Sequence, residues 1–168
     1  MQYIYHYNSL LGGITLAGEE KLTGLWFDGQ KYFGSTLSET CVLRELPIFE
    51  QAKHWLDIYF TGRMPDFTPP LKIDATPFRR AVWEILLAVP FGETITYKEI
   101  AAQIAERRGQ NSMSAQAVGG AVGHNPISLM IPCHRVVGSD GSLTGYAGGI
   151  DRKKKLLALE RGQIKIYL

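Results

Sequence analysis

Short runs of apolar residues, separated by turn-forming residues, occupy the first part of the chain. Three of these runs are rich in β-branched and aromatic side chains, namely residues 2–6, 13–17 and 22–27. Runs of this length with tight connections predict a small antiparallel sheet. The segment 46–60 instead carries apolar side chains at helical intervals, at Phe49, Ala52, Trp55, Leu56 and Tyr59. We expect it to form a helix that packs on the sheet through this face.

Capping signals predict two helices at the start of the second part of the chain. Thr76-Pro77 supplies the residue types preferred at an N-cap and a first helical position, and the apolar spacing continues to Ala88. Thr96 and Glu99 form a capping box of the Thr-x-x-Glu kind. The second helix should therefore start there and reach about Arg107.

Two more helices follow. The first should run from Ala115 to His124 with Ser114 or Ser112 as its cap, and the second should be capped by Asp151 and end at Gly162. The pair of helices on either side of residues 108–114 forms a helix-turn-helix arrangement.

The helix expected at 115–124 contains almost no side-chain bulk, because its residues include Ala115, Ala117, Gly119, Gly120 and Ala121. A glycine inside a helix costs about 1 kcal/mol relative to alanine, so this pair requires a reason. One reason is tight packing against a neighbouring helix. The other is entry into a narrow groove such as the minor groove of DNA, where readout of sequence is degenerate.

The element order predicts an α/β protein of the α+β type with two lobes. The N-terminal lobe, residues 1–74, would hold the sheet and one helix, and the mostly helical C-terminal lobe, residues 75–168, would carry the helix-turn-helix. Residues 1–74 contain six Lys/Arg and nine Asp/Glu, a net charge of −3, whereas residues 75–168 contain twelve and seven, a net charge of +5. The basic C-terminal lobe favours a polyanionic partner.

The two cysteines, Cys41 and Cys133, lie in unrelated surroundings. With no secretory signal and no long apolar segment, the sequence favours a reducing cytoplasm, no disulfide and no membrane partner. Cysteine and histidine lack the paired spacing of zinc sites, since His6, Cys41 and His54 are scattered. We therefore expect no metal ion.

Two residues with reactive side chains, Cys133 and His134, follow the apolar run 127–131. We expect this run to form a strand that Pro132 ends, which would hold the adjacent Cys133 in the domain interior. The cysteine is either a small buried hydrophobe or a nucleophile with His134 as its base. Successive side chains of an extended segment point to opposite faces, so the two residues need not touch, and a bridging water molecule would solve the geometry. Glu160 on the last helix is the natural carboxylate to orient the imidazole.

The segments Pro132-Cys133-His134-Arg135-Val136, Gly145-Tyr146-Ala147-Gly148-Gly149 and Leu156-Leu157-Ala158-Leu159-Glu160 together resemble the active-site region of the O6-alkylguanine-DNA alkyltransferases, also called methylated-DNA-protein-cysteine methyltransferases. The resemblance extends from about Thr76 to Gly162. It implies DNA repair by direct reversal of damage: the Cys133 thiolate attacks the alkyl carbon on O6 of guanine and keeps the alkyl group as a thioether. Each molecule would act once, without a cofactor, and O4-alkylthymine would be a second substrate.

The resemblance also implies the catalytic residues. Cys133, a water molecule, His134 and Glu160 would form a relay, Tyr97 would donate its hydroxyl to N3 of the leaving guanine, and Asn125 would tie the recognition helix to the active-site strand. Without the resemblance, we would expect Glu160 to be a solvated acid at a helix end. Tyr97 would be a half-buried core residue, and Asn125 would only end a helix.

Double-stranded DNA would bind a monomer through its minor groove, and the alkylated base would be flipped out because O6 lies inside the stacked duplex. Tyr146 would be an apolar wall for this base, the Ala147 amide would donate to O6, and the carbonyls of Cys133 and Val136 would accept from the guanine amino group. The residues implied at the DNA or the base are Thr96, Ala115, Gln116, Ala117, Gly119, Val122, Val136, Tyr146, Ala147 and Gly148.

One residue departs from the pattern that this resemblance implies, since Gln116 stands where an arginine usually fills the place of the flipped nucleotide. Glutamine hydrogen-bonds an orphaned base but lacks the planar cation that stacks and attracts phosphate. We hypothesise that Gln116 nevertheless fills this place. Two other basic features are weaker evidence for DNA binding. We expect Arg135 to have a structural role. The run 152–155 is either a phosphate contact or a solvated face.

Two other classes of protein remain open. A non-catalytic lesion-binding protein of the alkyltransferase-like type would flip damaged bases without repairing them, but such proteins replace the residue at Cys133. A cysteine hydrolase using Cys133, His134 and Glu160 would turn over many times and has no use for a basic helix-turn-helix. The number of product molecules formed per protein distinguishes the three.

Overall fold

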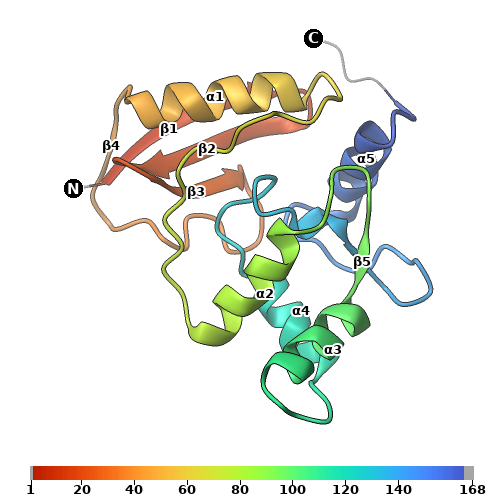
Figure 1. Ribbon diagram of the computed structural model, residues 1–168. Coiled ribbons are helices and arrows are strands. Elements are labelled where there is room, and N and C mark those ends of the chain that lie inside the picture. Colours follow the sequence, from red (N-terminus) through yellow and green to blue (C-terminus); the bar gives the residue numbers. More distant parts are fainter. Residues whose placement is uncertain (1, 165–168) are drawn as a thin grey trace.

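The computed structural model describes residues 2–164, which form a small sheet with one helix followed by a helical lobe (Figure 1). The first lobe contains β1 (Gln2–Ser9), β2 (Gly12–Gly18), β3 (Leu22–Phe27), β4 (Cys41–Leu43) and α1 (Pro47–Tyr59). The second contains α2 (Pro77–Leu87), β5 (Ile95–Thr96), α3 (Tyr97–Arg107), α4 (Ala115–Gly123), the 3₁₀ helix η1 (Cys133–Arg135), β6 (Val136–Val137) and α5 (Ile150–Glu160). The expected fold class is confirmed.

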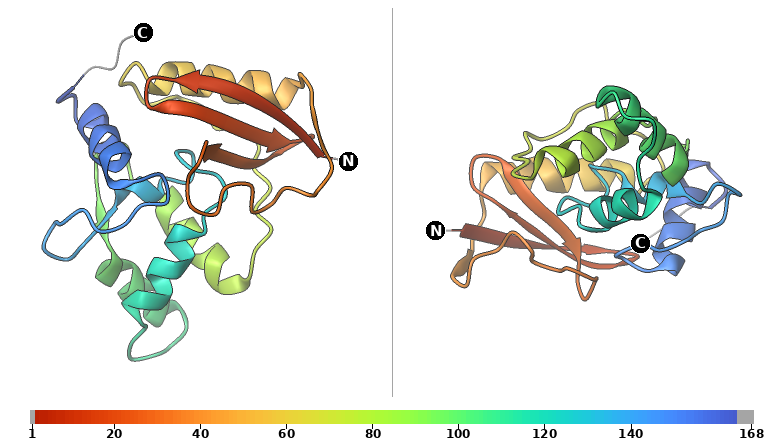
Figure 2. Two further views of the ribbon diagram at one scale, coloured as in Figure 1. Left: turned by 180° about the vertical axis from the view of Figure 1, so that it is seen from behind. Right: turned by 90° about the horizontal axis from the view of Figure 1, so that it is seen from below.

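The sheet of the first lobe has the strand order β3-β2-β1-β4. The first three strands pair antiparallel, as expected, but β4 adds a parallel edge strand beside β1. Strand β4 could not be predicted, because its three residues are too few to show an alternation of apolar and polar positions. Helix α1 covers one face of the sheet in both views (Figure 2) and buries the apolar face predicted for it.

The helix starts in the second lobe agree with the capping signals. The Thr76 side chain accepts from the Arg79 amide, and Thr96 accepts from the Glu99 amide at 3.0 Å. Ser114 caps α4 by accepting from Ala117 at 3.2 Å, which decides between the two candidate caps. The cap of α5 was predicted wrongly: Gly149, with φ +94°, precedes the helix and the expected cap Asp151 lies inside its first turn.

The segment that leads to Cys133 is not the strand that sequence analysis expected. Only a short bridge joins it to the free edge of β3, where the Leu25 amide donates to Pro126 and the Ser128 amide donates back to Leu25. The chain then turns, with Leu129 at φ +71° and the Ile131 amide donating to Ile127. A short buried apolar run does not reveal its backbone conformation, so the strand prediction failed here. The N-terminal sheet nevertheless anchors the segment that carries the cysteine.

Candidate functional site

Cys133 begins η1, where its amide donates to Ile131 at 2.8 Å, and its side chain is 4% exposed. A 3₁₀ helix has about three residues per turn, so consecutive side chains diverge by about 120°. The expected placement of Cys133 and His134 on opposite faces of a strand is therefore wrong. Both side chains are buried, and they leave the same tight turn in different directions.

The Glu160 carboxylate at the end of α5 accepts hydrogen bonds from several buried groups. Oε2 lies 2.5 Å from His134 Nε2, and Oε1 accepts from Arg135 Nε at 2.8 Å and from the Gly92 amide at 3.1 Å. Burial works to raise the pKa of this carboxyl, but the hydrogen bonds from His134 and Arg135 outweigh it and hold the pKa well below its ordinary value. Glu160 is therefore an anion inside the protein and not a solvated acid at a helix end.

The ionised carboxylate fixes the state of the His134 ring. Nε2 must carry a hydrogen to donate to Glu160, and burial lowers the pKa of the imidazole, with Glu160 opposing the shift. Nδ1 is then an unprotonated nitrogen, and it is buried without a hydrogen-bond partner among residues 2–164. His134 consequently has one nitrogen free to accept a proton.

The Cys133 thiol is protonated in the resting protein. Burial raises its pKa, and the nearby Asn125 amide and Lys153 ammonium offset this only in part. A thiol of this kind reacts as a nucleophile only if a base takes its proton as the reaction begins.

Tyr59 was assigned to the core, but its hydroxyl takes part in this network. The hydroxyl donates to Glu160 Oε2 at 2.6 Å, its ring lies edge-on to the His134 ring, and its side chain is fully buried. Helix α1 of the N-terminal lobe thus supplies a direct hydrogen bond to the carboxylate. Because 101 residues separate Tyr59 from Glu160, no local pattern in the sequence could have paired them.

Removing this hydroxyl should destabilise the protein. We expect Tyr59→Phe to lower the free energy of unfolding by about 1.5–3 kcal/mol, the usual range for a hydrogen bond to a charged group. Denaturant unfolding measures the effect. The matched control is Tyr7→Phe, which removes a hydroxyl bonded to Asp57 on the surface and should cost less than about 1 kcal/mol. Equal losses in the two variants would contradict the assignment of a buried charged network.

Arg135 and part of the basic run 152–155 are also structural. The Arg135 guanidinium donates to Glu160 and to the Val89 carbonyl at 2.7 Å, which confirms its expected structural role. Lys153 is fully buried and donates to the carbonyls of Val136, Gly145 and Thr144. Burial lowers the pKa of its ammonium to about 8, with the neighbouring Cys133 opposing the shift. Neither reading of this run, phosphate contact or solvated face, holds for Lys153.

A cavity of about 340 Å³ reaches Cys133. Six of the predicted site residues line it: Cys133, Tyr97, Gly119, Val122, Tyr146 and Ala147. It is also lined by residues that sequence analysis did not select: Lys31, Tyr32, Gly120, Gly123, His124 and Gly145. Tyr146 lines this cavity, and its hydroxyl is buried without a hydrogen-bond partner in the described part of the chain.

Two of the predicted residues, Asn125 and Tyr97, hold neighbouring segments together by side-chain hydrogen bonds. Asn125 is buried and bridges the end of α4 to the next segment, donating to the Ile131 carbonyl at 2.7 Å and accepting from the Ile127 amide at 3.0 Å. The Tyr97 hydroxyl donates to the Thr144 carbonyl at 3.1 Å.

The groups expected to face the flipped base already have neighbours inside the protein. The carbonyls of Cys133 and Val136, expected to face a guanine amino group, already accept from the Val136 amide and the Lys153 ammonium, although a carbonyl has a second lone pair. Gly148 leaves no room for a side chain, because a Cβ there would meet the Tyr146 ring at 2.6 Å.

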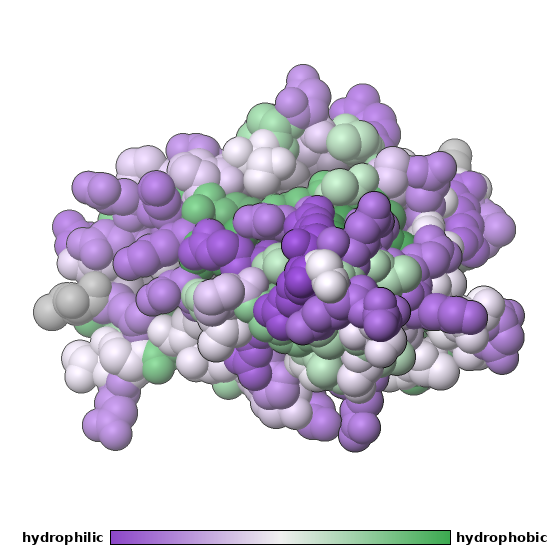
Figure 3. Space-filling model, turned by 60° about the horizontal axis from the view of Figure 1, so that its bottom comes forward, coloured by the Kyte–Doolittle hydropathy of each residue, from purple (hydrophilic) through white to green (hydrophobic). Residues whose placement is uncertain are grey.

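Helix α4 presents its small residues to solvent. Its exposed face consists of Ala115, Gln116, Ala117 and Gly120, while Val118, Ala121 and Val122 are buried. A Cβ at Gly120 would meet nothing within 4 Å, and one at Gly119 would only touch the Tyr97 ring. Tight packing therefore does not explain these glycines. Figure 3 shows the end of the molecule where α3 and α4 lie, which is mainly hydrophilic with apolar surface in the recesses.

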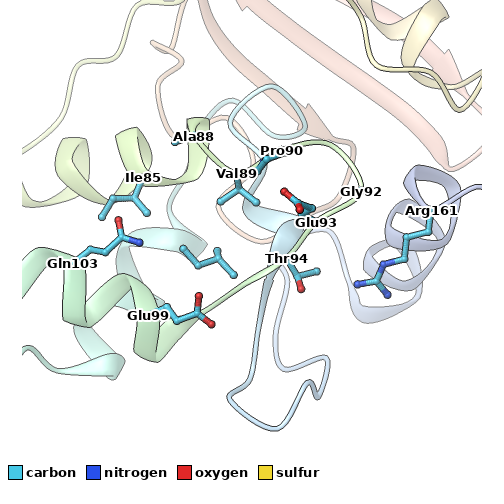
Figure 4. A pocket seen from close by; sticks show the side chains of 11 residues that line it. Ile85, Ala88, Val89, Pro90, Gly92, Glu93, Thr94, Glu99, Gln103 and Arg161 are labelled. Atoms are coloured by element: carbon cyan, nitrogen blue, oxygen red, sulfur yellow. The ribbon is translucent and has the colours of Figure 1, made fainter.

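A second cavity of about 550 Å³ lies between the α2–β5 connection, the start of α3 and Arg161. Figure 4 shows Glu93, Glu99 and Arg161 around it. No cysteine or histidine lines it, so it offers no thiol and no imidazole. Within residues 2–164, no group of His, Cys, Asp and Glu is arranged to hold a metal ion, and no helix there is long and apolar enough to cross a membrane.

Comparison with known proteins gives consistent matches along the chain. The family model of the 6-O-methylguanine DNA methyltransferase ribonuclease-like domain matches residues 2–73, and that of the DNA binding domain matches residues 77–162. The methylated-DNA–protein-cysteine methyltransferase of Mycolicibacterium paratuberculosis is 45% identical over 92% of this chain and 89% of its own length. That of Methanosarcina barkeri is 40% identical over 94% and 96%.

Solved structures agree with these relatives. The crystal structure of Mycobacterium tuberculosis OGT in complex with DNA has a TM-score of 0.83 and 40% identity, covering 97% of this chain and 95% of that chain. The crystal structure of the Mycobacterium tuberculosis O6-methylguanine methyltransferase has a TM-score of 0.80 and 41% identity, covering 98% and 95%.

Proposed function

The chain belongs to the 6-O-methylguanine DNA methyltransferase family, and from this premise we propose that Cys133 is the residue that accepts the alkyl group. Its function is DNA repair by alkyl transfer, and DNA is its partner. The observation that carries the proposal is the buried thiol of Cys133 in a cavity of about 340 Å³, next in sequence to a histidine whose free Nδ1 is backed by an anionic carboxylate.

The reaction begins with loss of the thiol proton. A water molecule carries this proton from Cys133 to Nδ1 of His134, and Glu160 stabilises the imidazolium through the Nε2 hydrogen bond. The thiolate sulfur bonds to the alkyl carbon, the bond from that carbon to O6 breaks, and its electron pair returns to the purine. The Tyr97 hydroxyl gives up its hydrogen bond to the Thr144 carbonyl and donates to N3 instead, and the proton taken from Cys133 finally neutralises the guanine.

The product is a thioether on Cys133, and no group of the site is suited to remove the alkyl group from sulfur. Each chain therefore acts once and needs no cofactor. O4-alkylthymine is a second substrate of the same chemistry. Titration of an O6-methylguanine duplex with increasing protein tests this: repaired lesions should equal the number of chains added. Several repaired lesions per chain would indicate a hydrolase, and none would indicate a lesion-binding protein.

DNA binds through its minor groove to the exposed face of α4, with the alkylated base flipped into the cavity. Two observations support this mode: the face is built from small residues, and packing does not require its glycines. Gln116 on this face fills the place of the flipped base. The site lies within one chain, which supports a monomer, and a reactive thiol suits the reducing cytoplasm.

A matched pair of substitutions at Gly120 tests the groove-facing role of α4. Gly120→Ala should raise the free energy of unfolding by about 0.5–1 kcal/mol, because alanine favours the helix and meets no neighbour. Gly120→Leu should keep the fold but weaken duplex binding at least about tenfold, measured by fluorescence anisotropy at fixed salt. Gln51→Leu on α1, at the other end of the molecule, is the control. Unchanged binding by Gly120→Leu would refute the groove-facing role.

A further inference from the structure

A loop from the N-terminal lobe reaches the cavity that contains Cys133. It follows β3, and its buried Gln30 side chain fixes its start by accepting from the Phe27 amide at 2.8 Å. The Lys31 amide then donates to the Ala147 carbonyl at 3.0 Å. This bond joins the N-terminal lobe to the segment 145–149, so the two segments border the cavity together.

Tyr32, the next residue, is held in an unusual conformation. Its φ is +60°, which an aromatic residue adopts only at a cost and only where its surroundings impose it. The ring stacks on the His124 ring at the end of α4, with centroids 3.9 Å apart and planes 24° apart. Strained conformations of this kind concentrate at functional sites, and here the strained residue lines the cavity.

The exposure of the cavity residues places Tyr32 at the mouth. Its side chain is 41% exposed, whereas Cys133 in the same cavity is 4% exposed. A nucleotide whose O6 substituent reaches the sulfur must have its remaining atoms nearer the mouth. The cavity volume of about 340 Å³ is at the lower end of the usual range for small-molecule sites, about 300–1,000 Å³. Three tyrosines, Tyr32, Tyr97 and Tyr146, are among its lining residues.

We propose that Tyr32 is a substrate-contact residue, and that its ring, together with His124, forms an aromatic wall against which the extruded alkylated nucleotide packs. The inference rests on the proposed function. It assigns the N-terminal lobe a direct part in holding damaged DNA. The contact exists only after a base leaves the duplex, so Tyr32 contributes to discrimination between damaged and intact DNA and not to general affinity. Loss of a base–aromatic contact commonly lowers affinity by about one order of magnitude or more.

The experiment compares Tyr32→Ala, Tyr32→Phe and the control Phe33→Ala, which lies on the same loop with similar exposure but outside the cavity. Single-turnover repair rates are measured against the concentration of an O6-methylguanine duplex, and binding of the unmodified duplex is measured in parallel. For Tyr32→Ala we expect the half-saturating concentration to rise about tenfold with unchanged binding of unmodified duplex. Tyr32→Phe and Phe33→Ala should stay within about twofold of the wild type.

Two outcomes would overturn the inference. Either an unchanged half-saturating concentration in Tyr32→Ala, or an equal loss of affinity for damaged and unmodified duplex, would show that the ring does not contact the extruded nucleotide. A wild-type protein that repairs nothing would instead overturn the proposed function, so the two failures are distinguishable.

Discussion

The Cys133→Ser protein will take up no alkyl group from a duplex that contains O6-methylguanine, while it keeps its fold and its affinity for DNA. The hydroxyl is nearly isosteric with the thiol, but it is a far weaker acid and a poorer nucleophile toward an alkyl carbon. Loss of a nucleophile commonly costs several orders of magnitude. We expect the transfer rate to fall by at least about 10⁴-fold, which corresponds to about 5.5 kcal/mol.

The second cysteine of the chain provides the matched control. Cys41 is exposed on β4, in the N-terminal lobe, so Cys41→Ser should react at the wild-type rate. Transfer is measured as radiolabelled methyl recovered on protein, and binding as anisotropy of the same duplex. Transfer that persists in Cys133→Ser, or that disappears in Cys41→Ser, would contradict the assignment of the nucleophile.

Glu160→Gln should have the largest effect on stability. The carboxylate neutralises Arg135 and accepts from His134, Tyr59 and Gly92. Glutamine has nearly the same shape, but it has one acceptor oxygen and an amide that would face these donors, and it leaves a buried guanidinium without its anion. Breaking a buried pair in this way costs about 3–5 kcal/mol. The repair rate should also fall, because no anion then stabilises the His134 imidazolium.

The pH dependence of unfolding gives this prediction a second readout. The folded pKa of Glu160 lies below its ordinary value of 4.5, so its stabilising contribution is present above that pH and is lost as the pH falls below it. The stability difference between wild type and Glu160→Gln should therefore be constant near neutral pH and shrink below about pH 4.5. Denaturant unfolding at several pH values measures it, with the exposed Glu106→Gln as control. A difference that does not change with pH would contradict a buried ionised carboxylate.

The helix starts could be predicted because the information is local. The Thr76 cap, the Thr96–Glu99 capping box and the Ser114 cap each depend on residues three positions apart, and the structure has the corresponding hydrogen bonds. The face of α1 that packs on the sheet was also predictable, because a helix repeats its apolar positions within a few residues.

The parts that failed depend on contacts between distant segments. The backbone around Leu129 is set by what the chain meets at β3 and not by its own apolar run, so the expected strand is absent. Tyr59 and Lys153 looked like an ordinary core residue and one of four surface cations, and only the fold brings them to Glu160 and Val136. The aromatic wall at Tyr32 was missed for the same reason, since its partner His124 belongs to the other lobe.

Alkyl transfer to Cys133 is tested by mass spectrometry of the wild-type protein after incubation with a duplex that carries one O6-methylguanine. Intact mass gives the number of methyl groups per chain, and peptide mapping gives their position. We expect one added methyl per chain at saturation, located on Cys133. A methyl group on any other residue, more than one per chain, or an unmodified protein after complete repair of the duplex would contradict it.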